Sequence, residues 1–246
     1  MKSVIDKKQI LEELKNQQEI FGDELYEKLT LEFKSPIKQE PNIKEKTEFY
    51  MPSTTLFEDY SNCKSLTELY DSIHNCQKCP LGKTRTKFVF GSGNPNAEAM
   101  IIGEAPGADE DQQGLPFVGR AGKLLTDILK AINFERDEVY IANILKCRPP
   151  NNRNPLPPEM DECTPYLYKQ IDLIKPKAIL LLGLIAAGSL LKTKDSLTKL
   201  RGNVFDLNGI KAMVTYHPAA LLRNPNWKRG CWEDVQKFRK LYDSIK

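Results

Sequence analysis

The apolar run AILLLG at residues 178–183 is the stretch that decides the fold, because it is short and carries no polar side chain. Such a run is typical of a strand buried on both faces of a parallel sheet. Comparable runs at residues 99–103, 139–144 and 212–216 are also predicted to be strands. Amphipathic segments at about residues 121–132, 158–174, 185–191 and 232–245 are predicted to be helices. The alternation predicts an α/β fold, a three-layer α/β/α sandwich around a central, mostly four-stranded parallel sheet.

A hairpin is predicted to lead into the last strand, because residues 205–211 have Asn208-Gly209 at their centre. This pair of residues is a strong signal for a two-residue turn between antiparallel strands. Ligands of parallel sheets gather at the carboxyl ends of the strands. Glu104, Asn143 and His217 each lie at or just past such an end, so we expect the functional site there.

The main domain is predicted to span residues 63–246, and residues 1–62 to form an N-terminal extension. Ser65-Leu66-Thr67-Glu68 has the form of a capping box, which starts a helix near the beginning of the domain. Residues 6–31 carry apolar side chains at the spacing of one helical face, and the proline- and lysine-containing residues 34–62 are predicted to be a flexible linker. The amphipathic helix either docks a protein partner or is a weakly ordered, solvated helix.

The charge of the chain is divided unevenly. Residues 1–60 hold 9 lysines and 13 acidic residues, a net charge of −4, whereas the remainder holds 27 basic and 20 acidic residues, a net charge of +7. A basic body suits an anionic partner. No apolar run approaches the ~20 residues of a membrane helix, and the first eight residues lack the apolar core of a signal peptide. We therefore expect a cytoplasmic protein with no membrane partner.

Six cysteines in a protein expected in the reducing cytoplasm indicate metal or redox chemistry more than disulfides. Cys76 and Cys79 form a CxxC pair, and Cys147 and Cys163 follow as single residues. Four thiolates suit either zinc or an iron–sulfur cluster. One pair with two singles favours a cluster, since zinc ribbons usually show two CxxC pairs. The alternative is a chance CxxC and two buried cysteines without a ligand.

Polar loops follow the predicted strands. GEAPG at residues 103–107 forms a tight turn whose backbone N–H groups can face a ligand. The amide of Asn143 can both donate to and accept from the edge of a nucleobase, or it can bond its own backbone. The basic loop at residues 146–153 includes Arg148 and Arg153, which could contact phosphates. His217 begins the last of these loops, where a catalytic role competes with a structural one.

Together these stretches resemble the family-4 uracil-DNA glycosylases, the iron–sulfur branch of their superfamily. The resemblance rests on CQKCPLGKTR (76–85), GEAPGADED (103–111), GLPFVGRAG (114–122), NILKCRPPNNRNP (143–155) and YHPAALLRNP (216–225). It implies an enzyme of base excision repair that flips uracil out of DNA and hydrolyses its N-glycosidic bond. By resemblance, a [4Fe–4S] cluster of structural role would be bound by Cys76, Cys79, Cys147 and Cys163.

The resemblance also implies roles in the pocket. Phe117 would stack on the flipped uracil, Asn143 would bond its N3 and O4, and His217 would donate to its O2. Glu104 and Ala105 would belong to the pocket wall, with Ala105 where better-known uracil glycosylases have an aspartate. Glu110 is the candidate for orienting the attacking water, or alternatively for excluding the methyl group of thymine.

The expected partner is uracil-containing DNA, single- or double-stranded, bound by a monomer. Leu222 would wedge into the gap left by the flipped base, and Arg148, Arg153 and Arg223 would contact DNA. Two rivals remain at this point. A non-catalytic zinc-binding nucleic-acid module would explain the cysteines and the charge, but not the GEAPG and YHP loops at strand ends. A cross-linking branch of the superfamily needs a histidine-bearing insert that residues 114–123 lack.

Overall fold

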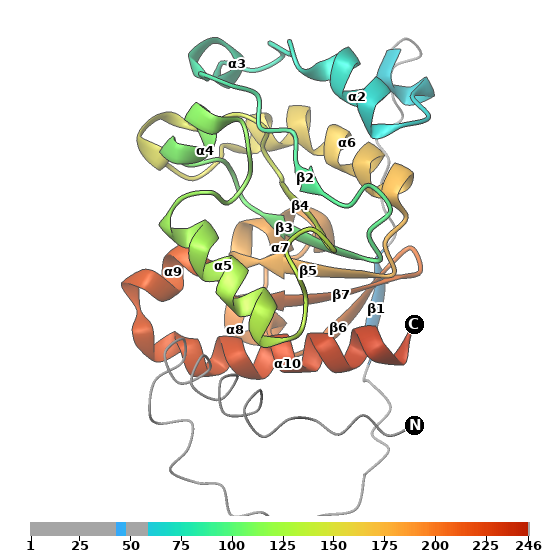
Figure 1. Cartoon of the computed structure of the whole chain (residues 1–246), viewed down its shortest axis with the longest axis vertical. Coiled ribbons are helices and arrows are strands. Elements are labelled where there is room, and N and C mark those ends of the chain that lie inside the picture. The colour runs from blue at the N-terminus through green and yellow to red at the C-terminus, as the bar shows by residue number, and fades with distance from the viewer. Residues whose placement is uncertain (1–42, 48–58, 246) are drawn as a thin grey trace, which may run out of the picture.

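The computed structural model describes residues 43–47 and 59–245, and within them the strands form one sheet (Figure 1). The order of the strands across the sheet is β1-β6-β7-β5-β3-β4-β2. Their bounds are β1 Ile43–Thr47, β2 Ser92–Gly93, β3 Ala99–Gly103, β4 Tyr140–Asn143, β5 Ala178–Leu182, β6 Val204–Leu207 and β7 Ile210–Thr215.

The centre of the sheet consists of the four predicted strands. Parallel pairs join β7 to β5, β5 to β3 and β3 to β4. The three-layer fold around a four-stranded parallel centre is therefore confirmed. The hairpin is confirmed too, because β6 and β7 are antiparallel and their turn residues Asn208 and Gly209 have φ values of 52° and 88°.

The edges of the sheet go beyond the prediction. At one edge the two-residue strand β2 pairs antiparallel with β4, and at the other β1 pairs parallel with β6. β1 lies within the stretch predicted as a linker, so a strand from the extension joins the sheet of the domain. Its sequence, IKEKT, contains a single large apolar residue, and short charged strands are common at sheet edges because they resist pairing with other chains. The helix predicted over residues 6–31 lies outside the described residues.

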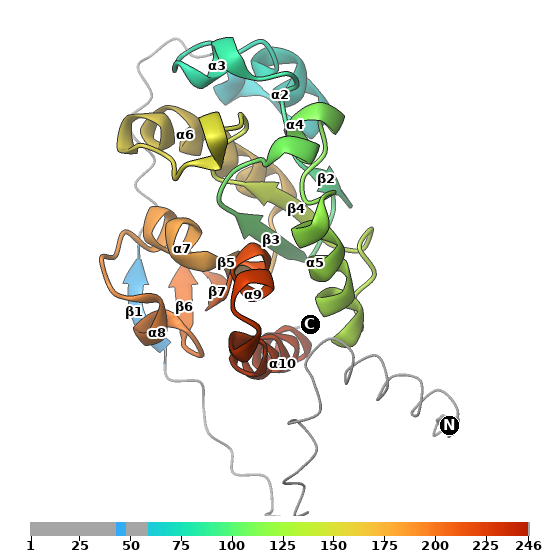
Figure 2. The ribbon, with the colours of Figure 1, turned by 90° about the vertical axis from the view of Figure 1, so that its left-hand side faces the viewer.

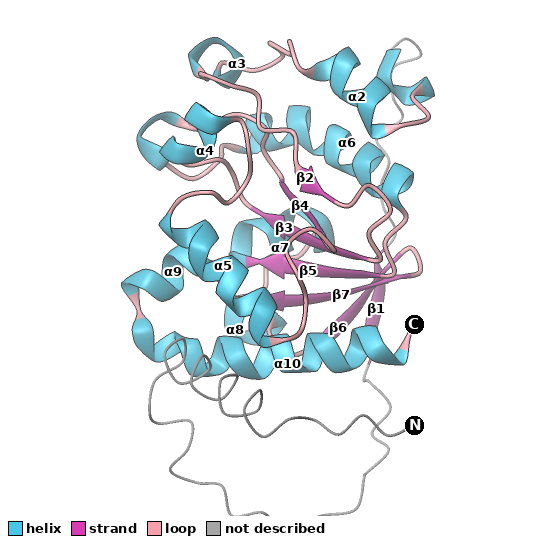
Figure 3. Cartoon of the chain, viewed as in Figure 1, coloured by secondary structure: helices cyan, strands magenta, loops and turns pink. Residues whose placement is uncertain are grey.

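Helices cover both faces of the sheet, as Figures 2 and 3 show. One core lies between the sheet and α2, α6 and α7, and it contains Met100, Ile102 and Leu181. The other lies between the sheet and α5 and α10, and it contains Ile101 and Leu180. The helices are α2 Leu66–Ile73, α3 Leu81–Thr84, α4 Ala108–Gln113, α5 Arg120–Ala131, α6 Pro157–Ile174, α7 Gly183–Leu191, α8 Leu197–Leu200, α9 Pro218–Arg223 and α10 Lys228–Ser244.

Local signals position these helices as expected. Ser65 Oγ accepts a hydrogen bond from the Glu68 N–H at 3.1 Å, and the Glu68 carboxylate accepts one from the Lys64 N–H at 2.7 Å. The predicted cap therefore forms, but the carboxylate of Glu68 bonds the N–H of Lys64, before the cap, and not that of Ser65, so the second half of the capping box is absent from this helix. Among the described residues, no helix combines the length and the apolar character needed to cross a membrane.

A buried ion pair fastens α10 to the end of β7. Asp234 Oδ2 accepts hydrogen bonds from Arg201 Nε at 2.7 Å and from Thr215 Oγ1 at 2.8 Å. The side chains of Arg201 and Asp234 are 15% and 4% exposed. Removing one partner of such a pair leaves the other charge buried without compensation. This pair therefore holds α10 against the strand that precedes His217.

We expect Asp234→Ala to lower the free energy of unfolding by about 3–5 kcal/mol, because Arg201 would be left buried and unpaired. Urea denaturation followed by circular dichroism measures the change. Lys199→Met is the matched control, since the side chains of the pair between Lys199 and Asp195 are 71% and 49% exposed, and it should cost no more than about 1 kcal/mol. Equal losses in the two variants would contradict this assignment.

Candidate active site

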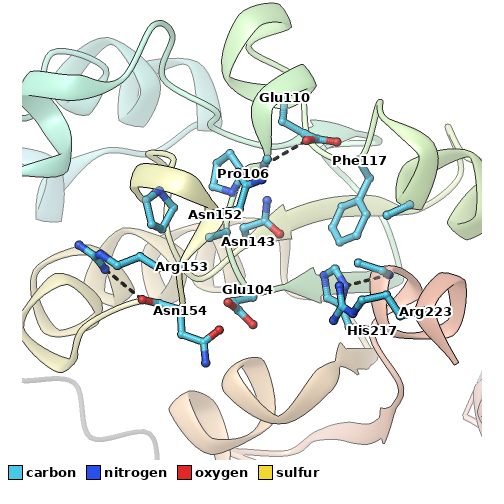
Figure 4. Close-up of a pocket in the computed structure, with 15 residues that line it drawn as sticks. Glu104, Pro106, Glu110, Phe117, Asn143, Asn152, Arg153, Asn154, His217 and Arg223 are labelled. Carbon is cyan, nitrogen blue, oxygen red and sulfur yellow. Dashed lines mark hydrogen bonds between the residues drawn. The ribbon is translucent and has the colours of Figure 1, made fainter.

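A cavity of about 310 Å³ opens at the carboxyl ends of the central strands (Figure 4). It brings together residues that lie more than a hundred positions apart in the sequence, among them Glu104 after β3, Asn143 at the end of β4 and His217 after β7. The lining residues are Glu104, Ala105, Pro106, Gly107, Glu110, Phe117, Ala121, Asn143, Pro149, Asn152, Arg153, Asn154, His217, Ala219 and Arg223.

Gly103 lets two side chains pack against the floor of the cavity. It pairs with Asn143 in the register of β3 and β4. A Cβ at this position would lie 2.5 Å from both Asn143 Oδ1 and Phe117 Cζ. Contacts that short do not occur between non-bonded atoms, so any larger residue would push the amide or the ring aside. Gly103 thus allows the Asn143 amide and the Phe117 ring to lie close against β3.

Phe117 is held in an unusual backbone conformation. Its φ of 52° lies in the left-handed region, which is costly for an aromatic residue. The start of α5 packs directly on its backbone, because a Cβ at Gly122 would collide with the Phe117 carbonyl. The ring is 6% exposed, and its centroid lies 5.6 Å from that of His217 with the planes tilted by 33°. The Phe117 ring, a flat wall of the cavity, is therefore fixed by the packing of α5 on its backbone and by its contact with His217.

Asn143 presents a buried acceptor that lacks a partner. The residue is 2% exposed, and its Oδ1 makes no hydrogen bond within the described part of the chain. Such orphaned atoms are rare, because each costs about 1–3 kcal/mol. Beside a cavity, an unpaired amide oxygen is best satisfied by an N–H group of a ligand. Sequence reasoning expected a base-reading amide here, and the orphaned atom supports that expectation.

His217 is held as a neutral donor. It caps the N-terminus of α9, and its Nδ1 accepts a hydrogen bond from the Ala219 N–H at 3.2 Å. The proton of the neutral ring is then on Nε2. Burial and, to a smaller extent, the nearby charge of Arg223 lower the pKa of His217 to about 4, although Glu110 opposes the shift. At neutral pH the imidazole is uncharged and can donate one hydrogen bond from Nε2.

Glu110 ties the two loops of the cavity together. Its carboxylate accepts hydrogen bonds from the N–H groups of Gly107 at 3.0 Å, Val118 at 2.9 Å and Gly119 at 3.0 Å. Three of the roughly four lone-pair sites of the carboxylate are thus occupied. The geometry gives Glu110 a positioning role on the GEAPG and GLPFVG loops, and its predicted action on water stays a prediction.

Glu104 offers a freer carboxyl group. It lines the cavity (Figure 4) and makes no side-chain hydrogen bond or ion pair to any residue that the structure describes. Burial raises the pKa of Glu104, while the positive charge of Arg223 opposes that shift. Ala105, next to it, contributes no ionisable group to the wall.

The four predicted thiols converge at one end of the molecule. Burial raises the pKa of Cys147, and the charges of Cys79 and Cys76 add to the shift. The pKa of Cys163 is likewise raised by burial, to about 12, and Cys147 and Cys76 contribute to it. Cys147 and Cys163 lie in one buried cluster against which Cys76 and Cys79 pack. Arg85 donates to both the Cys76 carbonyl and Cys147 Sγ, so the four cysteines share one neighbourhood.

Donors already point at three of the sulfur atoms. Tyr166 Oη lies 3.2 Å from Cys76 Sγ, Arg85 Nη1 lies 3.3 Å from Cys147 Sγ, and the Lys146 backbone nitrogen lies 3.3 Å from Cys163 Sγ. Hydrogen bonds to sulfur are typical of iron–sulfur sites. Within the described ranges, no three cysteine, histidine or acidic side chains form a group suited to a single metal ion. Four thiols are a donor set that iron–sulfur clusters use and that zinc accepts as well.

Sequence reasoning missed a buried polar network that joins the thiols to the cavity. Lys146 is completely buried, and its Nζ donates to the Asn143 carbonyl at 2.9 Å and to Gln170 Oε1 at 2.6 Å. Gln170 Nε2 in turn donates to the Phe90 carbonyl and Tyr140 Oη. Gln170 lies inside α6, where no motif marks it. The network anchors the backbone of the residue whose amide faces the cavity.

The predicted DNA-contact residues divide into two groups. Leu222 is 39% exposed and Arg223 is exposed at the mouth of the cavity, so both are accessible. Arg148 is half-buried and donates to Asn152 Oδ1 at 2.8 Å. Arg153 instead forms two hydrogen bonds with the buried carboxylate of Glu159. Its charge is thereby neutralised by a partner that caps α6, and its predicted contact with DNA stays a prediction.

The loop of Arg148 and Arg153 also contributes residues that sequence reasoning did not assign to the site. Pro149, Asn152 and Asn154 line the cavity. Asn151 and Asn152 have φ values of 54° and 53°, a left-handed conformation that asparagine tolerates better than most residues. The PPNN sequence was the available signal, since prolines followed by asparagines favour a tight, fixed loop.

Comparisons with known proteins agree with this geometry. The pattern of the uracil DNA glycosylase superfamily matches residues 90–236. The type-4 uracil-DNA glycosylase of Archaeoglobus fulgidus is 42% identical over 186 residues, which cover 72% of this chain and 94% of that protein. That of Sulfurisphaera tokodaii is 46% identical over 186 residues, covering 72% and 84%. That of Thermotoga maritima is 44% identical over 175 residues, covering 70% and 91%.

We expect the His217 imidazole to stay neutral, with its proton on Nε2, from pH 8 down to about pH 5. A pKa lowered to about 4 means that the ring binds its second proton only in acid. Nitrogen-15 NMR of a His74→Gln variant, in which His217 is the one remaining histidine, measures both tautomer and titration. A midpoint near the ordinary value of about 6.5 would contradict the neutral-donor assignment.

Proposed function

The chain belongs to the uracil-DNA glycosylase superfamily and to its type-4 branch, and from that membership we propose that it binds uracil in the cavity and hydrolyses its bond to deoxyribose. The resemblance first seen in the motifs is thereby confirmed at the level of the family. The substrate is DNA that contains uracil, and the product is DNA with an abasic site. The single observation that carries this proposal is the buried, unpaired Oδ1 of Asn143 beside the Phe117 ring.

The proposed recognition follows from the donors and acceptors of the base. Uracil presents an N–H at N3 and a carbonyl at O4, which pair with Oδ1 and Nδ2 of the Asn143 amide. Neutral cytosine has no proton at N3 and carries an amino group in place of O4, so it would leave buried polar groups unpaired. A site built around such hydrogen bonds rejects the wrong partner strongly. The fixed ring of Phe117 supplies a face on which the base stacks.

The proposed chemistry separates charge between base and sugar. As the bond between N1 and C1′ breaks, its electron pair stays with uracil and the sugar takes on cationic character. The Nε2–H of His217 donates to O2 of the departing anion. The neutral ring can make this bond because its Nδ1 accepts from the Ala219 N–H and its one proton is on Nε2. Water then bonds to C1′, and its proton is released as the abasic sugar forms.

Two carboxyl groups lie near enough to the cavity to orient that water. Glu110 is largely occupied by backbone N–H groups, whereas the Glu104 carboxyl has its lone pairs available. We therefore assign the water to Glu104 and give Glu110 the role of holding the loops, which departs from the expectation drawn from the motifs. A carboxylate at Glu104 would also stabilise the cationic sugar by its charge.

The base can reach the cavity only after it leaves the DNA stack, which costs a few kcal/mol. Leu222 and Arg223 lie on α9, directly after the cap formed by His217. From there Leu222 would occupy the gap left by the base, and Arg223 would contact a phosphate. Such contacts release counterions, so binding should weaken steeply as salt rises.

We further propose that Cys76, Cys79, Cys147 and Cys163 hold a [4Fe–4S] cluster. When bound, the cluster would supply a rigid cross-link between the CxxC turn, the end of the β4 loop and α6. It would thereby fix the loop of Arg148 beside the DNA. The hydrolysis itself requires no electron transfer, so the cysteines act on the reaction through structure alone.

Incubation with a uracil-containing oligonucleotide tests the proposed activity. The wild type should produce an alkali-labile abasic site. His217→Ala should reduce kcat by about 10²–10³-fold, the usual effect of removing one donor to a developing anion. Asn143→Ala should lose at least about 10²-fold in kcat/KM, because the base would lose its matched partners. His74→Ala, a histidine outside the cavity, is the control and should behave as wild type. Full activity in both cavity variants would refute the assignment.

Metal analysis tests the cluster. We expect a brown protein with about four iron atoms per chain, and loss of iron and colour in Cys163→Ala. Cys231→Ala is the matched control, because Cys231 is also buried but packs in the core on the opposite side of the sheet. One zinc ion per chain in a colourless protein would overturn the cluster and favour the zinc-module rival.

A further inference from the structure

Residues 222–229, called here the α9–α10 turn, comprise the end of α9, the connection to α10 and the start of α10. They present large apolar and cationic side chains together. Leu222 and Trp227 are 39% and 41% exposed. Arg223 and Arg229 are exposed and Lys228 is half-buried. Arg229 has an acidic neighbour, Glu233, at 3.5 Å in a solvent-exposed pair. Exposed aromatic rings among cations are typical of surfaces that bind single-stranded nucleic acid.

Trp227 is exposed and yet firmly held. Its ring stacks on Tyr216 with centroids 5.0 Å apart and planes 17° from parallel. The guanidinium of Arg201 lies 4.0 Å from the centroid of the Tyr216 ring and donates to its Oη at 2.8 Å. Arg201 is fixed in turn by buried Asp234. An exposed ring with this support loses little freedom when a ligand stacks on it.

The α9–α10 turn lies on the same side of the molecule as the cavity. In Figure 2 the side that carries α9 and the start of α10 faces the viewer. Arg223, at the end of α9, lines the cavity, and Trp227 follows it by four residues. Tyr216, on which Trp227 stacks, directly precedes His217. A strand whose uracil occupies the cavity would therefore pass close to the turn.

We propose that Trp227 is a stacking platform for an unpaired base next to the flipped uracil in single-stranded DNA. The inference rests on the proposed function and extends it, since Trp227 does not line the cavity. Arg223 and Lys228 would hold the phosphates on either side of the stacked base. Paired bases in a duplex are stacked on one another and cannot use the ring in this way. Trp227 would therefore favour single-stranded over double-stranded substrates.

Stacking on an aromatic side chain strengthens binding by about 5- to 150-fold per base. We expect Trp227→Ala to raise the Kd for a single-stranded oligonucleotide by a factor in this range, and the Kd for the matching duplex by less than about 3-fold. Trp227→Phe should retain most of the affinity, because it keeps a flat ring. Fluorescence anisotropy with labelled oligonucleotides measures both, and circular dichroism checks that the variants are folded.

Intrinsic fluorescence gives a second readout, because the chain has two tryptophans. Trp232 is 7% exposed and belongs to the core under α10. In a Trp232→Phe variant the signal comes from Trp227 alone, and a single-stranded oligonucleotide should quench it until the sites are filled. In Trp227→Phe the remaining signal from Trp232 should hardly change.

Uracil release by the wild type, measured in parallel, separates the two proposals. Wild-type release together with unchanged DNA affinity in Trp227→Ala and no quenching in Trp232→Phe would overturn the platform and leave the glycosylase intact. Quenching and lost affinity without any uracil release would support a DNA contact at Trp227 while refuting the proposed activity. An equal loss of affinity for single strands and duplexes would also overturn the stacking role, since a general contact would then explain the effect.

Discussion

The close approach of β3 and β4 at Gly103 and Asn143 is the constraint on which the site depends. Parallel pairing places the two residues in register, and the missing Cβ of Gly103 leaves just enough room for the Asn143 amide and the Phe117 ring. The amide can then lie at the floor of the cavity while its residue remains part of the sheet. A pair of strands within a sheet is a better support for a hydrogen-bonding group than a loop, because its position is set by the backbone ladder. The proposed recognition of the base therefore begins with strand pairing.

The remaining parts of the site are held by residues outside the β3–β4 pair. Lys146 connects the thiol region to Asn143, since its backbone N–H donates a hydrogen bond to Cys163 Sγ and its ammonium group donates one to the Asn143 carbonyl. Asp234 and Arg201 support Tyr216, which directly precedes His217. Asn143 and His217 thus each have a buried polar or charged support behind them. Such supporting groups hold reactive side chains within the narrow geometry that catalysis requires.

Much of this arrangement could be predicted from the sequence. The four central strands follow from their unbroken apolar runs, and the positions of Asn143 and His217 follow from the rule that parallel sheets bind ligands at their carboxyl ends. The strand IKEKT could not be predicted, because charged edge strands lack the apolar alternation that marks a strand. The hydrogen bonds of Glu110 with three N–H groups and the ion pair of Arg153 with Glu159 could not be predicted from the sequence either. Their partners depend on loop conformation, whereas the motifs specify only the residue type.

The unpaired oxygen of Asn143 links stability to specificity. Burying an acceptor without a donor costs the folded protein about 1–3 kcal/mol, and that cost is recovered only when a ligand brings an N–H to the right place. Neutral cytosine would place an acceptor against an acceptor and recover nothing. In the proposed function, the same burial that makes the free site unfavourable therefore increases the difference in affinity between uracil and cytosine. The proposed role of His217 follows the same logic, because the burial that disfavours its charged form keeps it a neutral donor, and its hydrogen bond would reach full strength only when negative charge develops on the base.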